Sequence, residues 1–316
     1  MLMIRPILSV NKGRQYKVHT VLFAIGIIAN CGGLLTPLGD PPLFMMYLRG
    51  TPFSWFFNLA PEWLFANGLL LAIYYFVDRH FIAKENPTPT EKTNKKRLVI
   101  RGRRNFILLA GVVLSVAFIN GHTMPFIDTN EYFKFIREGV TLLLAIISFA
   151  ITKKEHHEAN DFSWGPIQEV AYLFLGIFVT MVPCILYLEQ NAAALGVNSP
   201  NLFYYFSGTL SSFLDNTPTA VTFYSLAEGL VRQSPAQFAQ LPQVAGIPEI
   251  FMKAICTGAV FFGSMSYIGN GPNFMVKAIA DSAGVEMPHF FAYMYKFSLI
   301  VLLPIFILTQ LIFIGF

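Results

Sequence analysis

Long apolar stretches, separated by short polar segments, run through the whole chain of 316 residues. A helix needs about 20 mostly apolar residues to cross the hydrocarbon core of a bilayer. By that length the pattern predicts seven crossings, at residues 18–50, 55–78, 106–127, 132–151, 166–188, 250–284 and 289–315. We therefore expect an all-α polytopic membrane protein.

Two of these stretches, 18–50 and 250–284, are too long for one straight helix, and each has a Gly/Pro cluster near its middle. A further apolar stretch at 202–230 is interrupted by Asp215-Asn216-Thr217-Pro218. We expect this stretch to form a re-entrant helical hairpin. Because non-helical backbone at membrane depth is tolerated only where protein or water satisfies its polar groups, all three interruptions are candidate sites.

The two long stretches repeat one motif at an offset of 230 residues. Gly39-Asp40-Pro41-Pro42-Leu43-Phe44 aligns with Gly269-Asn270-Gly271-Pro272-Asn273-Phe274, so that Gly, Pro and Phe coincide. Each motif follows an apolar helix rich in small residues and precedes a full crossing. Inverted repeats with discontinuous helices at matching positions point to a midplane substrate site in a secondary transporter. The alternative is that Gly and Pro merely kink two packed helices.

The basic residues predict an orientation. Residues 84–104 hold eight Lys/Arg and two Glu, and residues 1–17 hold four Lys/Arg and no acid. Short loops rich in Lys and Arg stay in the cytoplasm. A cytoplasmic start places 17 Lys/Arg inside and 5 outside if residues 202–230 return to their own side, and 15 inside and 7 outside if they cross. The composition agrees with a membrane protein, since 54% of the residues are hydrophobic and only 13% are charged, against about a quarter in soluble domains.

Two carboxylates lie in the interruptions, Asp40 in the first broken helix and Asp215 in the hairpin tip. An ionised carboxylate at the bilayer centre costs about 2.5–3.5 kcal/mol on insertion scales, so such residues are functional candidates. The alternative for each is a purely structural N-cap. We expect Asp215 to lie more centrally, because it is next to Asn216 and Thr217.

Unwound helix ends expose carbonyl groups that can replace the water around a sodium ion. Two buried acids attract a cation, repel an anion and bind protons when the cation leaves. These arguments predict a site that Na⁺ and H⁺ occupy alternately, with Na⁺ at Asp215, Asn216 and Thr217. The predicted cation- and proton-binding residues are Asp40, Asp215, Asn216, Thr217, Thr36, Gly39, Ser266, Gly269, Asn270 and Asn273.

Three segments, at residues 29–42, 211–219 and 267–274, resemble the ion transporter superfamily and are most similar to NhaD-type sodium/proton antiporters. The resemblance implies secondary active transport by alternating access, with Na⁺ or Li⁺ and H⁺ as the transported ions. That superfamily also contains citrate and dicarboxylate carriers and arsenite pumps. Na⁺-coupled transport of citrate, a dicarboxylate or another anion is therefore the alternative to Na⁺/H⁺ antiport.

The resemblance also implies a division of the chain. A transport domain would combine residues 1–82 with 200–316, the latter holding a hairpin at 200–230, a broken helix at 250–284 and the last helix at 289–315. Residues 83–104 would be a basic cytoplasmic loop, and residues 105–199 would supply scaffold helices and a linking arm. The scaffold of this superfamily usually dimerises, so we expect a homodimer. Members carry a hairpin in each repeat; the first is incomplete here, so an N-terminal truncation is expected.

Other functional classes find little support in the sequence. It has no metal-ligand cluster, phosphate loop or nucleophile–His arrangement, so we expect no enzyme and no cofactor beyond the transported ions. The three cysteines lie in apolar stretches without paired spacing. A channel would need a continuous lined pore, whereas inverted repeats favour alternating access. We expect a multi-pass protein of the bacterial inner membrane that contacts the lipid bilayer and binds no nucleic acid.

Overall fold

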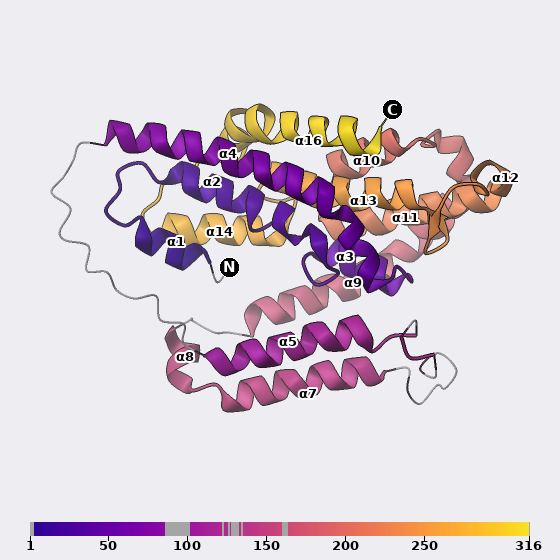
Figure 1. Ribbon diagram of the computed structural model, residues 1–316, viewed down its shortest axis with the longest axis horizontal. Helices are drawn as coiled ribbons and strands as arrows, with labels where there is room; N and C mark the ends of the chain where they lie inside the picture. Colours follow the sequence, from indigo (N-terminus) through magenta and orange to yellow (C-terminus); the bar gives the residue numbers. More distant parts are fainter. Residues whose placement is uncertain are drawn as a thin grey trace. The chain divides into compact units, whose positions relative to one another are not determined.

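The computed structural model describes residues 3–85, 102–121, 123–125, 127, 133, 135–159 and 164–315, which are almost entirely helical (Figure 1). They divide into two compact units. The larger unit contains Met1–Thr51, Trp55–Thr90 and Val179–Phe316, and the smaller contains Pro52–Ser54 and Glu91–Phe178. The predicted boundary between scaffold and transport domain lies at residue 199 instead, and that division stays a prediction.

The larger unit contains α1 (Ile4–Val10), α2 (Val18–Ile27), α3 (Pro41–Leu48), α4 (Ala60–Lys84), α10 (Pro200–Ser211), α11 (Asn216–Gln233), α12 (Pro235–Phe238), α13 (Glu249–Phe262), α14 (Gly271–Ser282), α15 (Phe290–Tyr293) and α16 (Leu303–Thr309). Two short strands, β1 (Gln243–Val244) and β2 (Ile247–Pro248), form an antiparallel pair. Helix α9 (Gly165–Asn191) passes from the smaller unit into the larger one.

The first long apolar stretch is a broken helix. After α2 the chain forms a 3₁₀ turn at Cys31–Leu35 and then becomes extended at Thr36 (φ −143°, ψ 152°). Helix α3 begins after the extended N-cap residue Asp40 (φ −152°, ψ 141°). Pro41 and Pro42 occupy its first turn, where the helix needs no N–H donor, so the sequence favours a restart at this point.

The second broken helix repeats this path 230 residues later. Helix α13 is followed by a 3₁₀ turn at Gly263–Met265 and an extended Ser266 (φ −141°, ψ 169°). Helix α14 begins after Asn270 (φ −150°, ψ 133°). Both predicted interruptions are therefore confirmed as discontinuous helices of nearly the same conformation.

Paired glycines let each break fold back on itself. A Cβ atom added to Gly39 would overlap the carbonyl oxygen of Gly33. A Cβ atom on Gly269 would lie 2.7 Å from the carbonyl oxygen of Gly263 and 2.6 Å from that of Ser211, closer than real Cβ contacts. Since backbone atoms would have to move, these positions require glycine.

The two repeats run in opposite directions. Asn30, after α2, bonds to Asn270, before α14, while Lys17 at the start of α2 and Ser282 at the end of α14 line one pocket. Helices α2 and α14 are therefore antiparallel. Helix α4 also packs against the last helix, Phe290–Ile314 (Figure 1). The ring centroid of Phe65, near the start of α4, lies 5.6 Å from the ring centroid of Phe313, at the end of the last helix, so these two helices are antiparallel as well.

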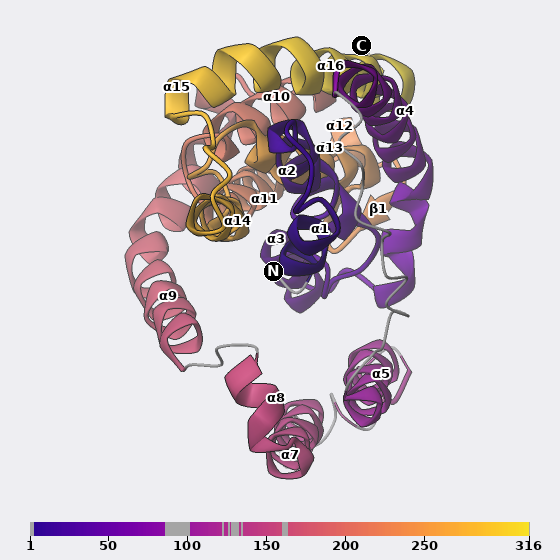
Figure 2. The same cartoon turned by 90° about the vertical axis from the view of Figure 1, so that its left-hand side faces the viewer.

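The interrupted stretch at 202–230 forms the expected helical hairpin, in which α10 and α11 join at Ser212–Asp215. Helix α13 packs closely against both (Figure 2). Small residues permit this, since a Cβ atom on Gly208 would lie 2.7 Å from the Phe262 ring and one on Gly258 would lie 2.6 Å from the Tyr204 carbonyl oxygen. The hairpin tip is thereby held beside the second break.

The smaller unit contains α5 (Arg103–Phe118), α7 (Ile136–Ile151) and α8 (Lys154–Ala159), and α5 packs side by side with α7 (Figure 1). The predicted crossing at 106–127 is too long, because the helix ends at Phe118. Asn120 ends the helix by bonding to the backbone on both sides of it. Its side-chain nitrogen donates to the Ala117 carbonyl at 2.8 Å, and its side-chain oxygen accepts from the Thr123 N–H at 3.0 Å.

Three described helical stretches are long and apolar enough to cross a membrane: Val18–Leu35, Phe53–Lys84 and Phe290–Ile314. Arg104–Phe118 and Val179–Leu188 are shorter apolar helices. The predicted crossing at 250–284 does not count as one span, because its halves are helices of 14 and 12 residues. The protein is an all-α polytopic membrane protein.

Candidate functional site

Both breaks and the hairpin tip meet at one place in the larger unit. Five side chains meet there and form what we name the central polar cluster: Asn30, Asp40, Asn216, Asn270 and Asn273. Each is at most 5% exposed. Buried polar groups are costly unless they are hydrogen-bonded, so the bonds within this cluster decide what it can hold.

Asp40 is the carboxylate of the central polar cluster. The amide nitrogen of Asn216 donates to Asp40 Oδ2 at 2.9 Å, and that of Asn270 donates to Oδ1 at 3.3 Å. Among the described residues no Lys, Arg or His forms an ion pair with it. Neutral amides alone do not remove the penalty for a buried negative charge, so the position favours a cation or a proton.

Asn30 links the two breaks. Its amide nitrogen donates to Asn273 Oδ1 at 2.7 Å, and its oxygen accepts from Asn270 at 3.0 Å. Asn273 in turn donates to the carbonyl oxygens of Gly263 and Ser266, at 2.8 and 2.9 Å. The site prediction missed Asn30, although a single amide in the apolar run before Cys31 was a usable signal.

At the hairpin tip, the neighbouring residues Asp215 and Asn216 have different roles. Asp215 Oδ1 accepts from the Thr217 N–H at 2.9 Å, which caps the N-terminus of α11. Asp215 is only half-buried, whereas Asp40 is buried. The expectation that Asp215 is the more central acid is therefore not met, because its carboxylate folds back onto its own helix. Asn216 instead enters the cluster, and its oxygen has no partner among the described residues.

The other predicted site residues shape the backbone of the breaks. The Ser266 hydroxyl donates to the Ser212 carbonyl of the hairpin tip and accepts from the Gly269 N–H at 3.0 Å. Gly39 donates its N–H to the Thr36 carbonyl at 2.9 Å. Thr217 is buried at the tip. The structure thus brings every predicted position to the breaks or the tip, while their roles in ion binding stay predictions.

Comparison with known proteins gives a family. The family described as "Putative citrate transport" matches residues 1–314, nearly the whole chain. The chain belongs to this family. The description of this family names transport, as does the predicted resemblance to a transporter superfamily. The match supports the coarser part of the predicted resemblance, a membrane transporter, but not the narrower NhaD type.

A curated relative agrees with the membrane assignment. A "46 kDa membrane protein" of Mycobacterium leprae (strain TN) is 25% identical over 299 residues, which cover 90% of this chain and 66% of that protein. The chain thus spans just under two thirds of the length of this relative. No solved structure matches the chain.

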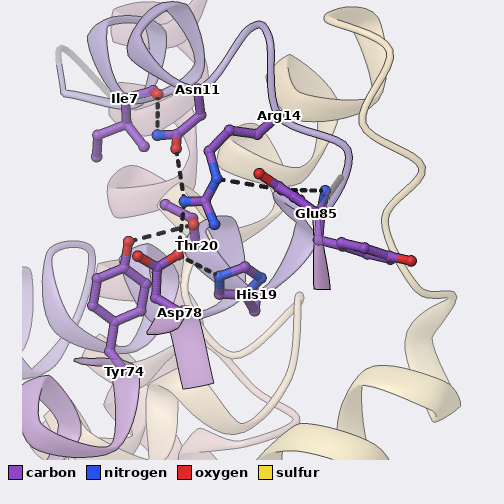
Figure 3. Close-up of polar contacts among 9 residues, drawn as sticks. Ile7, Asn11, Arg14, His19, Thr20, Tyr74, Asp78 and Glu85 are labelled. Carbon is purple, nitrogen blue, oxygen red and sulfur yellow. Dashed lines mark hydrogen bonds and ion pairs between the residues drawn. The ribbon is translucent and has the colours of Figure 1, made fainter. Parts of the chain in front are cut away.

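A second polar network lies at the other end of α2 (Figure 3). Asp78 Oδ1 accepts from Arg14 Nη1 at 2.7 Å and lies 2.8 Å from His19 Nε2. Glu85 accepts from the Tyr16 N–H at 3.1 Å and lies 3.5 Å from Arg14 Nε. These contacts, here named the Arg14 network, tie the loop before α2 to the end of α4, away from the two breaks.

Proposed function

We propose that this protein is a secondary active transporter of citrate or a related di- or tricarboxylate. The observation that carries the proposal is the family match over residues 1–314. The fold supports it, since two discontinuous helices of opposite direction meet at a buried polar site, the arrangement in which secondary transporters hold their substrates.

Three helix N-termini converge on the central polar cluster and favour an anion. Asp40 and Asn270, the N-caps of α3 and α14, are hydrogen-bonded to each other. Asn216, the first residue of α11, is bonded to Asp40. Each N-terminus carries roughly half a positive charge, and such ends bind carboxylates. Three together offset the repulsion that one acid exerts on a bound anion.

Asp40 supplies the coupling in this proposal. A carboxylate substrate beside an ionised Asp40 needs a compensating positive charge, which Na⁺ or H⁺ can provide. The side-chain oxygen of Asn216 has no hydrogen-bond partner among the described residues, and the amide nitrogen of the same side chain contacts Asp40. Asn216 and Asp40 can therefore each contribute an oxygen ligand to a cation. Binding of the cation and the anion would then be mutually favourable, which is the requirement for symport.

Na⁺/H⁺ antiport is the second candidate. One observation favours it: Asp40 is buried with amide partners and, within the described part of the chain, no cationic partner. Such a carboxylate can exchange Na⁺ for H⁺ by itself. The argument from a pair of buried acids is weaker than the sequence suggested, because Asp215 caps its own helix.

Transport in proteoliposomes separates the candidates. Purified protein would be given radiolabelled citrate or radiolabelled succinate under an inward Na⁺ gradient or an inward H⁺ gradient. We expect accumulation of citrate above its equilibrium level under at least one gradient. Na⁺-dependent loss of an imposed pH gradient without citrate or succinate transport would establish antiport instead. If neither citrate nor succinate accumulates under either gradient, the proposal is contradicted.

A further inference from the structure

A pocket of about 650 Å³ lies between α1 and α14. Three cationic side chains line it: Arg5, Lys12 and Lys17. Leu8, Ile279 and Val285 add apolar surface, and no described lining residue carries a carboxylate. The pocket therefore joins positive charge to an apolar wall, and neither proposed transport mechanism uses it.

Nearby charges do not cancel this positive charge. Arg14 is paired with Asp78, and on α14 Lys277 is paired with Asp281 at 2.6 Å. In contrast, within the described part of the chain neither Lys12 nor Lys17 has an ion-pair partner. An ammonium group without a carboxylate partner is available to an anionic ligand.

The end of α14 does not oppose an anion strongly, although helix C-termini are negative. Its terminal carbonyls already accept hydrogen bonds: Val285 N–H bonds to the Ala280 carbonyl at 3.0 Å and Gly284 N–H to the Asp281 carbonyl at 3.0 Å. Gly284 has a positive φ of 74°, the usual conformation of such a helix end.

The pocket lies at a boundary between polar and apolar sequence. Lys17 immediately precedes Val18–Leu35, a stretch apolar enough to cross the membrane. The distribution of Lys and Arg predicts that this end faces the cytoplasm, where anionic lipids give the membrane surface its negative potential. Cationic side chains here would be at headgroup level, with the apolar wall toward the acyl chains.

We propose that this pocket binds the phosphate-bearing headgroup of an anionic phospholipid. Lys12 and Lys17 contact the phosphodiester, and Leu8, Ile279 and Val285 contact the glycerol backbone and the first methylenes of an acyl chain. Basic pockets between membrane helices recognise lipid phosphates by this combination of charge and apolar contact. A free phosphate would use the same lysines but gain nothing from the apolar wall.

The test is binding of phosphatidylglycerol to the delipidated protein in neutral detergent, measured by native mass spectrometry. Lys12→Gln/Lys17→Gln removes two charges from the pocket. Lys153→Gln/Lys154→Gln removes two charges from exposed positions in the smaller unit and is the matched control. Each Lys near an anionic surface contributes about fivefold in affinity, so the pocket variant is expected to bind about 30-fold more weakly. The control variant and Lys12→Arg/Lys17→Arg should bind as the wild type does.

The other arms identify the source of the phosphate. Phosphatidylcholine should bind weakly to all variants, and soluble glycerol 3-phosphate should displace phosphatidylglycerol only at a large excess. Equal loss of binding in the control variant, or none in the pocket variant, would overturn the proposal. So would citrate or glycerol 3-phosphate binding as tightly as the lipid with the same dependence on Lys12 and Lys17. Since no transport is measured, the result is independent of the transported solute.

Discussion

The two broken helices have the same backbone but different chemistry. The N-cap residues Asp40 and Asn270 differ by 2° in φ and 8° in ψ, and each follows a 3₁₀ turn and an extended residue. One is a carboxylate and the other an amide, bonded to each other at 3.3 Å. The two breaks therefore share one backbone geometry, but only the first carries a charge, and the proposed mechanism places cation coupling there.

The surroundings of the breaks differ as well. The Arg14 network ties α2 to α4 in the first repeat, but the positions 230 residues after Arg14, His19 and Asp78 are Val244, Glu249 and Leu308. The hairpin tip contacts both breaks, the first through the bond from Asn216 to Asp40 and the second through the bond from Ser266 to the Ser212 carbonyl. The Arg14 network is therefore a contact of the first half that the second half lacks.

The largest effect is expected from changing the backbone geometry that both breaks share. In Gly39→Ala the new Cβ atom overlaps the Gly33 carbonyl, so we expect loss of at least about 3 kcal/mol of stability or no folded protein. Gly271→Ala is the control, because nothing lies within 4 Å of its Cβ position. Thermal unfolding in detergent measures both. Equal melting temperatures would show that the tight turn is not required.

The asymmetry of charge is broken by Asn270→Asp, which gives both breaks a carboxylate. Two acids about 3 Å apart cannot both ionise easily, and a doubled negative charge repels citrate. We expect the KM for citrate to rise at least tenfold at pH 8 and to recover toward pH 5.5, where one acid is protonated. The comparison is the ratio of variant to wild-type KM at each pH. A ratio that does not change with pH would contradict this account of the site.

Asp78→Asn tests the contact network that only the first repeat has. It leaves Arg14, whose side chain is 19% exposed, without its closest anionic partner. We expect a loss of about 1–3 kcal/mol of stability, between the values for surface and buried pairs, with an unchanged KM for citrate. Asp281→Asn, which breaks an i,i+4 pair on α14, should cost less than about 0.5 kcal/mol. Similar losses of stability in the two variants would show that the Arg14 network has no special role.

The smallest effect is expected at the hairpin tip. Thr217→Val removes one buried oxygen at nearly constant volume. If that oxygen is one of several around a cation, the apparent Na⁺ affinity should fall by up to about tenfold while the melting temperature stays within a few degrees. The measurement is Na⁺ dependence of citrate uptake. An unchanged affinity would exclude Thr217 from the site.

Much of the fold could be predicted from the sequence because its signals are local. Gly and Pro at matching positions predicted both breaks, and Asp-Asn-Thr-Pro predicted the hairpin tip. The crossing at 106–127 was drawn too long, since the pattern of apolar residues did not show that Asn120 bonds back to the helix and ends it.

The site was less predictable because its chemistry depends on contacts between distant segments. Asp40 and Asp215 look alike in the sequence, and only the fold shows that one accepts bonds from Asn216 and Asn270 while the other caps its own helix. Asn30 was missed for the same reason. Its two side-chain partners, Asn273 and Asn270, lie 243 and 240 residues away, and the apolar helix around Asn30 does not show which residues they are.

The central claim is that Asp40 couples a cation gradient to the movement of citrate. Its most direct test is citrate accumulation in proteoliposomes under an inward Na⁺ or H⁺ gradient, for the wild type, Asp40→Asn and Asp215→Asn. Asn caps a helix about as well as Asp but binds neither Na⁺ strongly nor a proton. We predict accumulation by the wild type and Asp215→Asn, and a loss of at least 100-fold in the initial rate for Asp40→Asn with normal folding. Wild-type accumulation by Asp40→Asn would contradict the account.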